Sequence, residues 1–242
     1  YGFAPHTGLY TDMNAIRRDE TPDCLHSIYV DQWDWEKIIL PEERSLGTLT
    51  EAAKRIMDAL GESEEALCLR FSQIKPFLPR ELFTVSAEEL AARWPNLSPK
   101  EREDAICKEK KAVFLTGIGG RLSDGKPHDL RAPDYDDWDK NGDLLIWYPV
   151  LSRAVEVSSM GIRVDAPALR RQLEEAGCGA RAALPFHAAL LNGELPQTMG
   201  GGIGQSRICM LLLQKAHIGE VQASAWPEGM RAACRKAGVP LL

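Results

Sequence analysis

Gly200-Gly201-Gly202-Ile203-Gly204-Gln205-Ser206-Arg207 is a glycine-rich stretch that ends in an arginine. It matches neither GxxxxGKS, GxxxxGKT nor GxGxxG in any register, and no strand–helix–strand pattern surrounds it, which excludes a P-loop and a Rossmann dinucleotide site. Glycine content alone favours a flexible turn that breaks the chain. The apolar segment 205–214 is predicted to form a helix, so Arg207 would lie in its first turn beside free backbone N–H groups. Such a position suits a phosphate or the face of a nucleobase.

Secondary-structure patterns extend on both sides of this stretch. Residues 25–40 predict a strand, residues 112–118 a buried strand, and residues 143–150 and 154–164 an antiparallel hairpin. Three helices are predicted to begin at capping-box patterns, formed by Thr48 and Glu51, by Ser86 and Glu89, and by Ser98 and Glu101. Strands, then helices, then strands predict one α+β domain over residues 1–242, with an antiparallel β-sheet flanked by helices.

Composition and charge narrow the functional classes. The chain has 242 residues and a net charge of −6, so non-specific binding to nucleic acid is not expected. Its six cysteines contain no CxxC pair, which argues against a zinc site or a disulfide framework. The longest apolar run, residues 208–213, is too short to span a bilayer, and the N-terminal residues lack the pattern of a secretion signal. We therefore expect a cytoplasmic protein without nucleic-acid or membrane partners.

Gln32 and Asp34 form a polar face on the strand predicted at 25–40. Residues two apart on a strand share a face, so the amide and the carboxylate are expected to point the same way and to receive polar groups of an amino acid. A solvated strand face is the alternative, and it is the simpler interpretation of an isolated pair of this kind. Trp33 and Trp35 lie on the opposite face and are expected in the core.

Asp143 and Glu156 supply one carboxylate to each strand of the predicted hairpin. Two carboxylates on neighbouring strands are the sparse oxygen set that Mg²⁺ prefers when phosphates and waters complete its coordination. A surface salt bridge is the alternative for either carboxylate alone. The polar loop 125–138 precedes them, and Arg131 and Asp136 are its candidate functional residues.

Three segments in the same order resemble the motifs of class II aminoacyl-tRNA synthetases of the aspartate and asparagine branch. The segments are Arg17-x-Asp19-Glu20 with Gln32-x-Asp34 for motif 2, residues 156–163 for the strand that holds amino acid and metal, and residues 202–207 for motif 3. Residues 26–36, 131–138 and 195–207 are similar, nearly residue for residue, to ammonia-dependent asparagine synthetases. The similarity runs from about Gly8 to Pro227.

The resemblance implies an ATP-dependent ligase that converts L-aspartate and ammonia to L-asparagine, AMP and pyrophosphate through a β-aspartyl adenylate. It also implies ATP as a substrate, Mg²⁺ as a cofactor and a homodimer as the assembly. The implied catalytic residues are Arg17, Arg163 and Arg207; the ATP-binding residues are Arg17, Glu20, Leu25, Ser27, Arg131, Asp136, Asp143 and Arg207; the aspartate-binding residues are Gln32, Asp34, Ser158, Ser159 and Arg163; and the metal ligands are Asp143 and Glu156.

Two features of the sequence depart from the family pattern. The family carries a further N-terminal segment with dimerisation elements, and it carries a longer glycine-containing loop between Trp138 and Gly142. Either the protein is truncated or it possesses residues at both places that the numbered chain does not include, and we expect the second.

Two other classes of protein share this fold. A tRNA-charging enzyme is disfavoured by the acidic charge and by the lack of an appended anticodon-binding domain in this sequence. A non-catalytic binding protein is disfavoured because arginines and carboxylates occur in all three motifs. No cysteine has the neighbours of a glutaminase nucleophile, so ammonia is the expected nitrogen donor.

Overall fold

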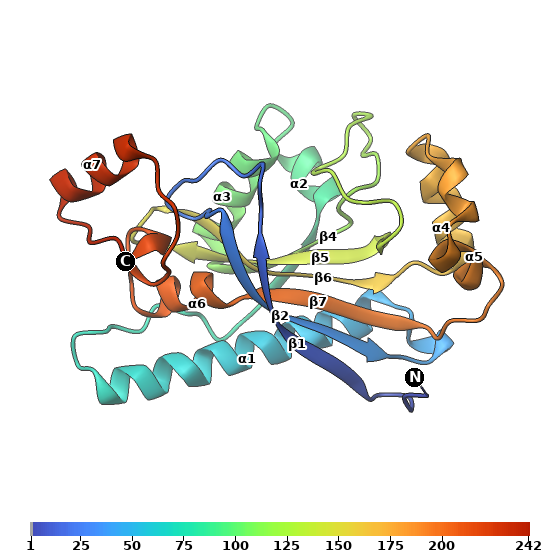
Figure 1. Ribbon diagram of the computed structural model, residues 1–242, viewed down its shortest axis with the longest axis horizontal. Coiled ribbons are helices and arrows are strands. Elements are labelled where there is room, and N and C mark those ends of the chain that lie inside the picture. The colour runs from blue at the N-terminus through green and yellow to red at the C-terminus, as the bar shows by residue number, and fades with distance from the viewer. Residues whose placement is uncertain (1) are drawn as a thin grey trace.

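Within residues 2–242, which the computed structural model describes, seven strands form one sheet in the order β1-β2-β7-β6-β5-β4-β3 (Figure 1). The strands are β1 (Gly8–Ile16), β2 (Tyr29–Ile38), β3 (Phe83–Ser86), β4 (Ala112–Thr116), β5 (Asp136–Tyr148), β6 (Arg153–Arg163) and β7 (Thr198–Gly204). The helices are α1 (Leu46–Arg70), α2 (Ala87–Arg93), α3 (Pro99–Lys110), α4 (Ala166–Glu175), α5 (Pro185–Leu191), α6 (Gln205–Leu212) and α7 (Glu228–Ala237), with short 3-10 helices η1 (Pro41–Glu43), η2 (Gly179–Ala183) and η3 (Ile218–Glu220). Neighbouring strands are antiparallel except β3 and β4, and the helix-flanked sheet confirms the predicted α+β class.

Different helices cover the two faces of the sheet (Figure 1). α1 packs on one face, where Met57 joins Leu144 and Ile146 of β5 in the larger hydrophobic cluster. α2 and α3 pack on the opposite face, where Ile106 joins Leu145 in a second cluster. Successive residues of a strand point to opposite faces, which is why Leu144 and Leu145 belong to different clusters.

The three predicted helix starts have different outcomes. Capping boxes at Ser86 and Ser98 begin α2 and α3, as predicted. The prediction for the first helix was wrong by one turn, because α1 is capped by Ser45, whose side chain accepts a hydrogen bond from Thr48 N at 3.1 Å. Thr48 is therefore the third residue of the helix, and its N–H is the group that is capped.

The glycine-rich stretch does not break the chain as expected. Residues 198–204 form β7, which lies between β2 and β6, and α6 then begins at Gln205 as predicted. Glycine is required because a Cβ at Gly201 would approach the backbone oxygen of Ser159 to 2.6 Å and the Cβ of Met160 to 2.7 Å. Glycine within a strand often marks such a close approach between the backbones of neighbouring strands.

The predicted strands are present with shifted bounds. β2, β4 and β6 fall within or within one residue of their predicted ranges, and β5 and β6 form the predicted antiparallel pair. β5 begins at Asp136, seven residues before its predicted start. Trp35 packs against the larger core cluster, but Trp33 is 38% exposed, so its predicted core position was wrong. None of the helices in residues 2–242 is both long and apolar enough to cross a membrane.

Candidate active site

The face of the sheet that carries α3 also carries a row of residues across four strands. Asp34 of β2 pairs with Gly202 of β7, Gly202 with Ser159 of β6, and Ser159 with Asp143 of β5. Paired residues of adjacent strands point to the same face. Gly202 leaves the centre of the row without a side chain, and a Cβ there would approach Asp34 Oδ1 to 2.6 Å and Gln32 Nε2 to 3.1 Å. The predicted shared face of Gln32 and Asp34 is thus confirmed, and both side chains extend over Gly202.

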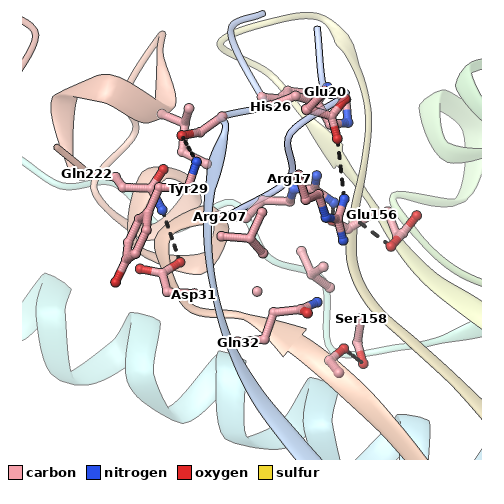
Figure 2. Close-up of a pocket in the computed structure, with 17 residues that line it drawn as sticks. Arg17, Glu20, His26, Tyr29, Asp31, Gln32, Glu156, Ser158, Arg207 and Gln222 are labelled. Atoms are coloured by element: carbon pink, nitrogen blue, oxygen red, sulfur yellow. Dashed lines mark hydrogen bonds and ion pairs between the residues drawn. The ribbon is translucent and has the colours of Figure 1, made fainter. Parts of the chain in front are cut away.

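A cavity of about 160 Å³ lies beside this row (Figure 2). Of the predicted site residues, those that line it are Arg17, Glu20, Leu25, Ser27, Gln32, Glu156, Ser158 and Arg207. They come from the segment between β1 and β2, from β2 itself, from β6 and from the first turn of α6. The N-terminal and C-terminal parts of the chain therefore meet in one cavity.

Two guanidinium groups point into this cavity (Figure 2). Arg17 directly follows β1, where its N–H donates to Ile28 O at 2.7 Å, and its Nη1 donates to Glu20 Oε2 at 3.4 Å. Arg207 lies in the first turn of α6, and its Nη1 donates to the backbone oxygen of Glu156 at 2.8 Å. The side chain of Arg17 is 51% exposed, so it is free to contact a ligand. Two cations in a small cavity suit an anion such as a phosphate.

Asp143 and Glu156, which we call the acid pair, lie close together on the same face. A register shift between β5 and β6 places Glu156 opposite Leu145, two residues along β5 from Asp143. Asp143 is 3% exposed, and its Oδ2 forms an ion pair with Arg131 Nη2. Its Oδ1 is buried and has no hydrogen-bond partner among the described residues. Burial and then the charge of Glu156 raise the pKa of Asp143 to about 7.

The acid pair fits a divalent cation. An unpartnered, buried carboxylate oxygen beside a second carboxylate is costly unless a cation approaches both groups. Within residues 2–242 no cluster of three or more His, Cys, Asp or Glu side chains could hold a metal by itself. Two carboxylates without a third protein ligand match a Mg²⁺ ion that takes its other oxygens from phosphates and water.

Arg163 is held by several side chains of the protein. Its Nε and Nη2 donate to Glu36 at 3.0 and 2.8 Å, its Nη1 binds Asp136, and its Nη2 donates to the hydroxyl of Tyr135 at 3.0 Å. The guanidinium also lies 4.0 Å from the centre of the Tyr135 ring. Most of its N–H groups are therefore engaged within the protein, and little remains for the bidentate contact with a substrate that the sequence suggested.

The carboxylate of Asp34 has fewer partners within the protein than the carboxylates of Glu36 and Asp136, which pair with Arg163. Neither Asp34 nor Gln32 makes a side-chain hydrogen bond within the described part of the chain, so both are available to a ligand. Burial raises the pKa of Asp34, and the nearby Arg163 guanidinium opposes this shift only in part. A partly buried carboxylate without a partner attracts a cationic group such as an ammonium.

The hydroxyl groups of two predicted site residues serve the fold. Ser158 Oγ donates to Gly202 O at 2.9 Å and Ser158 pairs with Leu144, whose side chain is in the core on the α1 side. Ser27 Oγ donates to Ser224 Oγ at 2.7 Å and accepts from Tyr29 N. Both residues still line the cavity.

Sequence reasoning did not identify Glu36 or Asp31. Glu36 continues the period-two alternation of Gln32 and Asp34, and that pattern was the signal that could have identified it. Asp31 accepts from Ser206 N at 3.1 Å and from Ser206 Oγ at 2.5 Å, so it caps the start of α6. Figure 2 shows Asp31 across β2 from Gln32, where it supports the helix that carries Arg207.

Comparisons with known proteins agree on one family. The family model described as aspartate-ammonia ligase matches residues 1–238. The aspartate--ammonia ligase of Lactobacillus johnsonii is 58% identical over 243 residues, covering 100% of this chain and 72% of that protein. The aspartate--ammonia ligase of Clostridium perfringens strain 13 is 57% identical over 242 residues, with the same coverage of 100% and 72%.

Solved structures of similar fold are tRNA synthetases. Asparaginyl-tRNA synthetase from Pyrococcus horikoshii complexed with asparaginyl-adenylate matches with a TM-score of 0.67 and 14% identity, over 91% of this chain and 54% of that chain. Aspartyl tRNA synthetase from Entamoeba histolytica matches with a TM-score of 0.64 and 14% identity, over 89% and 47%. At this identity the likeness shows the class II synthetase fold alone. The family model and the relatives together show that the chain belongs to the aspartate-ammonia ligase family.

Proposed function

We propose that this ligase activates L-aspartate with ATP as a β-aspartyl adenylate and releases L-asparagine, AMP and pyrophosphate. The observation that carries the proposal is the continuity of the site: Asp34 and Asp143 lie in one row across Gly202. The two arginines of the adjoining cavity lie beside this row. An amino-acid end and a phosphate end are thus combined on one face of the sheet.

The phosphate end is proposed to bind ATP. Arg17 and Arg207 would neutralise the charge that develops on the α-phosphate, because fixed cations at a reacting phosphate lower the barrier to nucleotidyl transfer. Arg131 would hold the leaving phosphates from the other side of the acid pair. The remaining proposed ATP-binding residues are Glu20, Leu25, Ser27 and Asp143. Asp136, which the resemblance also assigned to ATP, instead pairs with Arg163 at the amino-acid end.

The acid pair is proposed to hold Mg²⁺. When bound there, the ion would neutralise phosphate charge and orient the leaving group. Asp143 contributes its unpartnered Oδ1, and Glu156 contributes the second carboxylate.

The amino-acid end of the site, around Asp34 and Arg163, carries a net negative charge. We propose that this charge orients the substrate aspartate. The carboxylates of Asp34, Glu36 and Asp136 surround the single guanidinium of Arg163. An ammonium group is favoured at this end, and the β-carboxylate is favoured toward the arginines of the phosphate end. Arg163 is proposed to bind a substrate carboxylate through the N–H donor capacity that its protein partners leave unused. Gln32, Ser158 and Ser159 complete the proposed aspartate site.

The proposed reaction has two displacement steps. An oxygen of the aspartate β-carboxylate forms a bond to the α-phosphorus of ATP, and the bond to the bridging oxygen of pyrophosphate breaks. The nitrogen of ammonia then forms a bond to the β-carbonyl carbon of the adenylate, AMP leaves with the former carboxylate oxygen, and the nitrogen loses a proton. No oxidant or reductant is needed.

We also propose that the chain acts as a homodimer in the cytoplasm, without nucleic-acid or membrane partners. The family resemblance and the net charge of −6 support this part of the proposal. Sedimentation equilibrium of the full chain tests the dimer, and a monomer at all concentrations would contradict it.

The products test the proposed function. With L-aspartate, ATP, Mg²⁺ and ammonium, the full chain is expected to form asparagine, AMP and pyrophosphate in equal amounts. Replacing ammonium with glutamine should abolish asparagine formation. ADP and inorganic phosphate in place of AMP and pyrophosphate would show γ-phosphoryl activation and overturn the adenylate mechanism.

A further inference from the structure

α3 forms a wall of the site beside the acid pair. It packs on the sheet face that carries Asp143, because Ile106 of α3 joins Leu145 of β5 in one cluster and residues two apart on β5 share a face. The first turn of α3 carries Lys100, and the next carries Glu103. Neither residue is part of the site described above.

Glu103 is a buried carboxylate that links two segments. It is 5% exposed, and its two oxygens accept from Lys100 Nζ at 3.1 and 3.0 Å. Its Oε1 also lies 3.0 Å from Nε2 of the buried His128. His128 precedes Arg131 by three residues in the same loop, so Glu103 ties α3 to the loop that carries Arg131.

Lys100 lies one helical turn before Asp104, whose Oδ1 accepts a hydrogen bond from Ala154 N of β6 at 2.6 Å, so the side of α3 that carries Lys100 faces the strand of Glu156. Burial acts to lower the pKa of Lys100, but the carboxylates of Glu103 and then of the acid pair raise it overall. Burial acts to lower the pKa of Arg131, but the carboxylates of Asp143, Glu156 and Asp129 raise it overall. Arg207 Nη1 lies 3.9 Å from Glu156 Oε1. Arg131 from the loop and Arg207 from α6 thus lie against the acid pair, and Lys100 approaches the same face of the sheet from α3.

The side chain of Lys100 is available to a ligand. It is 60% exposed, and both of its hydrogen bonds go to Glu103, which leaves part of its donor capacity free. Lys100 is the exposed end of this pair, and Glu103 has a second, buried partner in His128. A purely structural role therefore gives little reason for a lysine at this position.

We propose that Lys100 is a further substrate-binding residue, which contacts the β- and γ-phosphates of ATP and the pyrophosphate that leaves. The inference rests on the proposed function, because it assumes that pyrophosphate is the leaving group. Glu103 is the residue that positions Lys100, and the unpartnered Oδ1 of Asp143 marks the adjacent cation position. The AMP half of the nucleotide lies at the cavity with Arg17 and has no contact with Lys100.

Binding of pyrophosphate and of AMP, each measured by calorimetry with Mg²⁺ present, tests this inference. Lys100→Met is expected to weaken pyrophosphate binding roughly tenfold or more, since it removes a charge-assisted hydrogen bond, and to leave AMP binding unchanged. Lys100→Arg should restore most of the affinity. Lys108→Met, an exposed lysine of the same helix, is the matched control and should bind both ligands as the wild type does. If Lys100→Met fails to fold, Lys100→Gln provides the same comparison.

The possible outcomes separate this inference from the proposed function. Unchanged pyrophosphate binding in Lys100→Met, or equal losses for pyrophosphate and AMP, would overturn the inference and leave the proposed function standing. A wild-type chain that binds AMP but no pyrophosphate would overturn both. A selective loss of pyrophosphate binding with recovery in Lys100→Arg supports the direct contact.

Discussion

Arg17 and Arg18 are neighbours of the same type in different surroundings. Arg17 lines the cavity and donates to Glu20, whereas Arg18 is 88% exposed and pairs only with its neighbour Asp19. Successive residues at the end of a strand point in opposite directions, so only one of the two guanidinium groups enters the site.

Arg17→Ala is expected to lower kcat/KM by about 2–4 kcal/mol of transition-state stabilisation, roughly a hundredfold or more in rate. The reason is the loss of a cation that binds the α-phosphate most strongly as it reacts. Arg18→Ala should change kcat/KM by much less, because an exposed charge contributes little. Steady-state kinetics of the two variants provide the comparison. Equal losses would contradict the placement of Arg17, and a larger loss at Arg18 would reverse it.

Orientations of neighbouring side chains follow from the local sequence, whereas contacts between distant residues do not. The shared face of Gln32 and Asp34 follows from a local period of two, and the structure confirms it. The partners of Arg163 follow from no such rule, because Glu36 lies 127 positions away and Asp136 lies 27 positions away. Only the sheet brings these three side chains together, so the competition for the guanidinium could not be predicted from the sequence.

One face of β7 lies in the proposed aspartate site, and the other face packs in the core. Successive glycines of this strand face opposite sides of the sheet, since Gly202 faces Asp34 and Gly201 faces Met160. The same small substitution at neighbouring positions should therefore have different consequences.

Gly202→Ala is expected to raise the KM for aspartate severalfold or more with little loss of stability, because the added Cβ meets the movable ends of Asp34 and Gln32. Gly201→Ala is expected to lower the free energy of unfolding by about 1–3 kcal/mol, because its Cβ meets the backbone of Ser159 within a packed sheet. Aspartate kinetics and denaturant titration of both variants give the readout. Gly229→Ala is the control, since no atom lies within 4 Å of its added Cβ. A Gly202→Ala enzyme with an unchanged KM would contradict the position of aspartate above Gly202.

At the element scale, local signals predicted helices better than the central strand. The capping boxes at Ser86 and Ser98 act within four residues, so the sequence alone located the starts of α2 and α3. The first start was misplaced because Ser45 offers an equally good cap one turn earlier. β7 was missed because its strand conformation depends on pairing with β2 and β6, and strand propensity is set largely by such neighbours.

The whole molecule places residues from its two ends in one site. β2 and β7 are adjacent in the sheet although most of the chain lies between them, and this pairing brings the segment with Arg17 beside the helix with Arg207 (Figure 1). Periodicity and capping predicted the class of fold, but they contain no information about this strand order. The resemblance of three motifs implied that Arg17 and Arg207 serve one site, but it was not accompanied by a predicted strand order.

Oxygen transfer from aspartate to AMP tests the adenylate mechanism most directly. Aspartate labelled with ¹⁸O in both oxygens of its β-carboxylate is incubated with the full chain, ATP, Mg²⁺ and ammonium, and the mass of each nucleotide product is measured. Attack of the β-carboxylate on the α-phosphorus transfers one ¹⁸O atom to each AMP that forms, and asparagine retains the other. AMP without the label, or ¹⁸O in inorganic phosphate beside ADP, would contradict the adenylate.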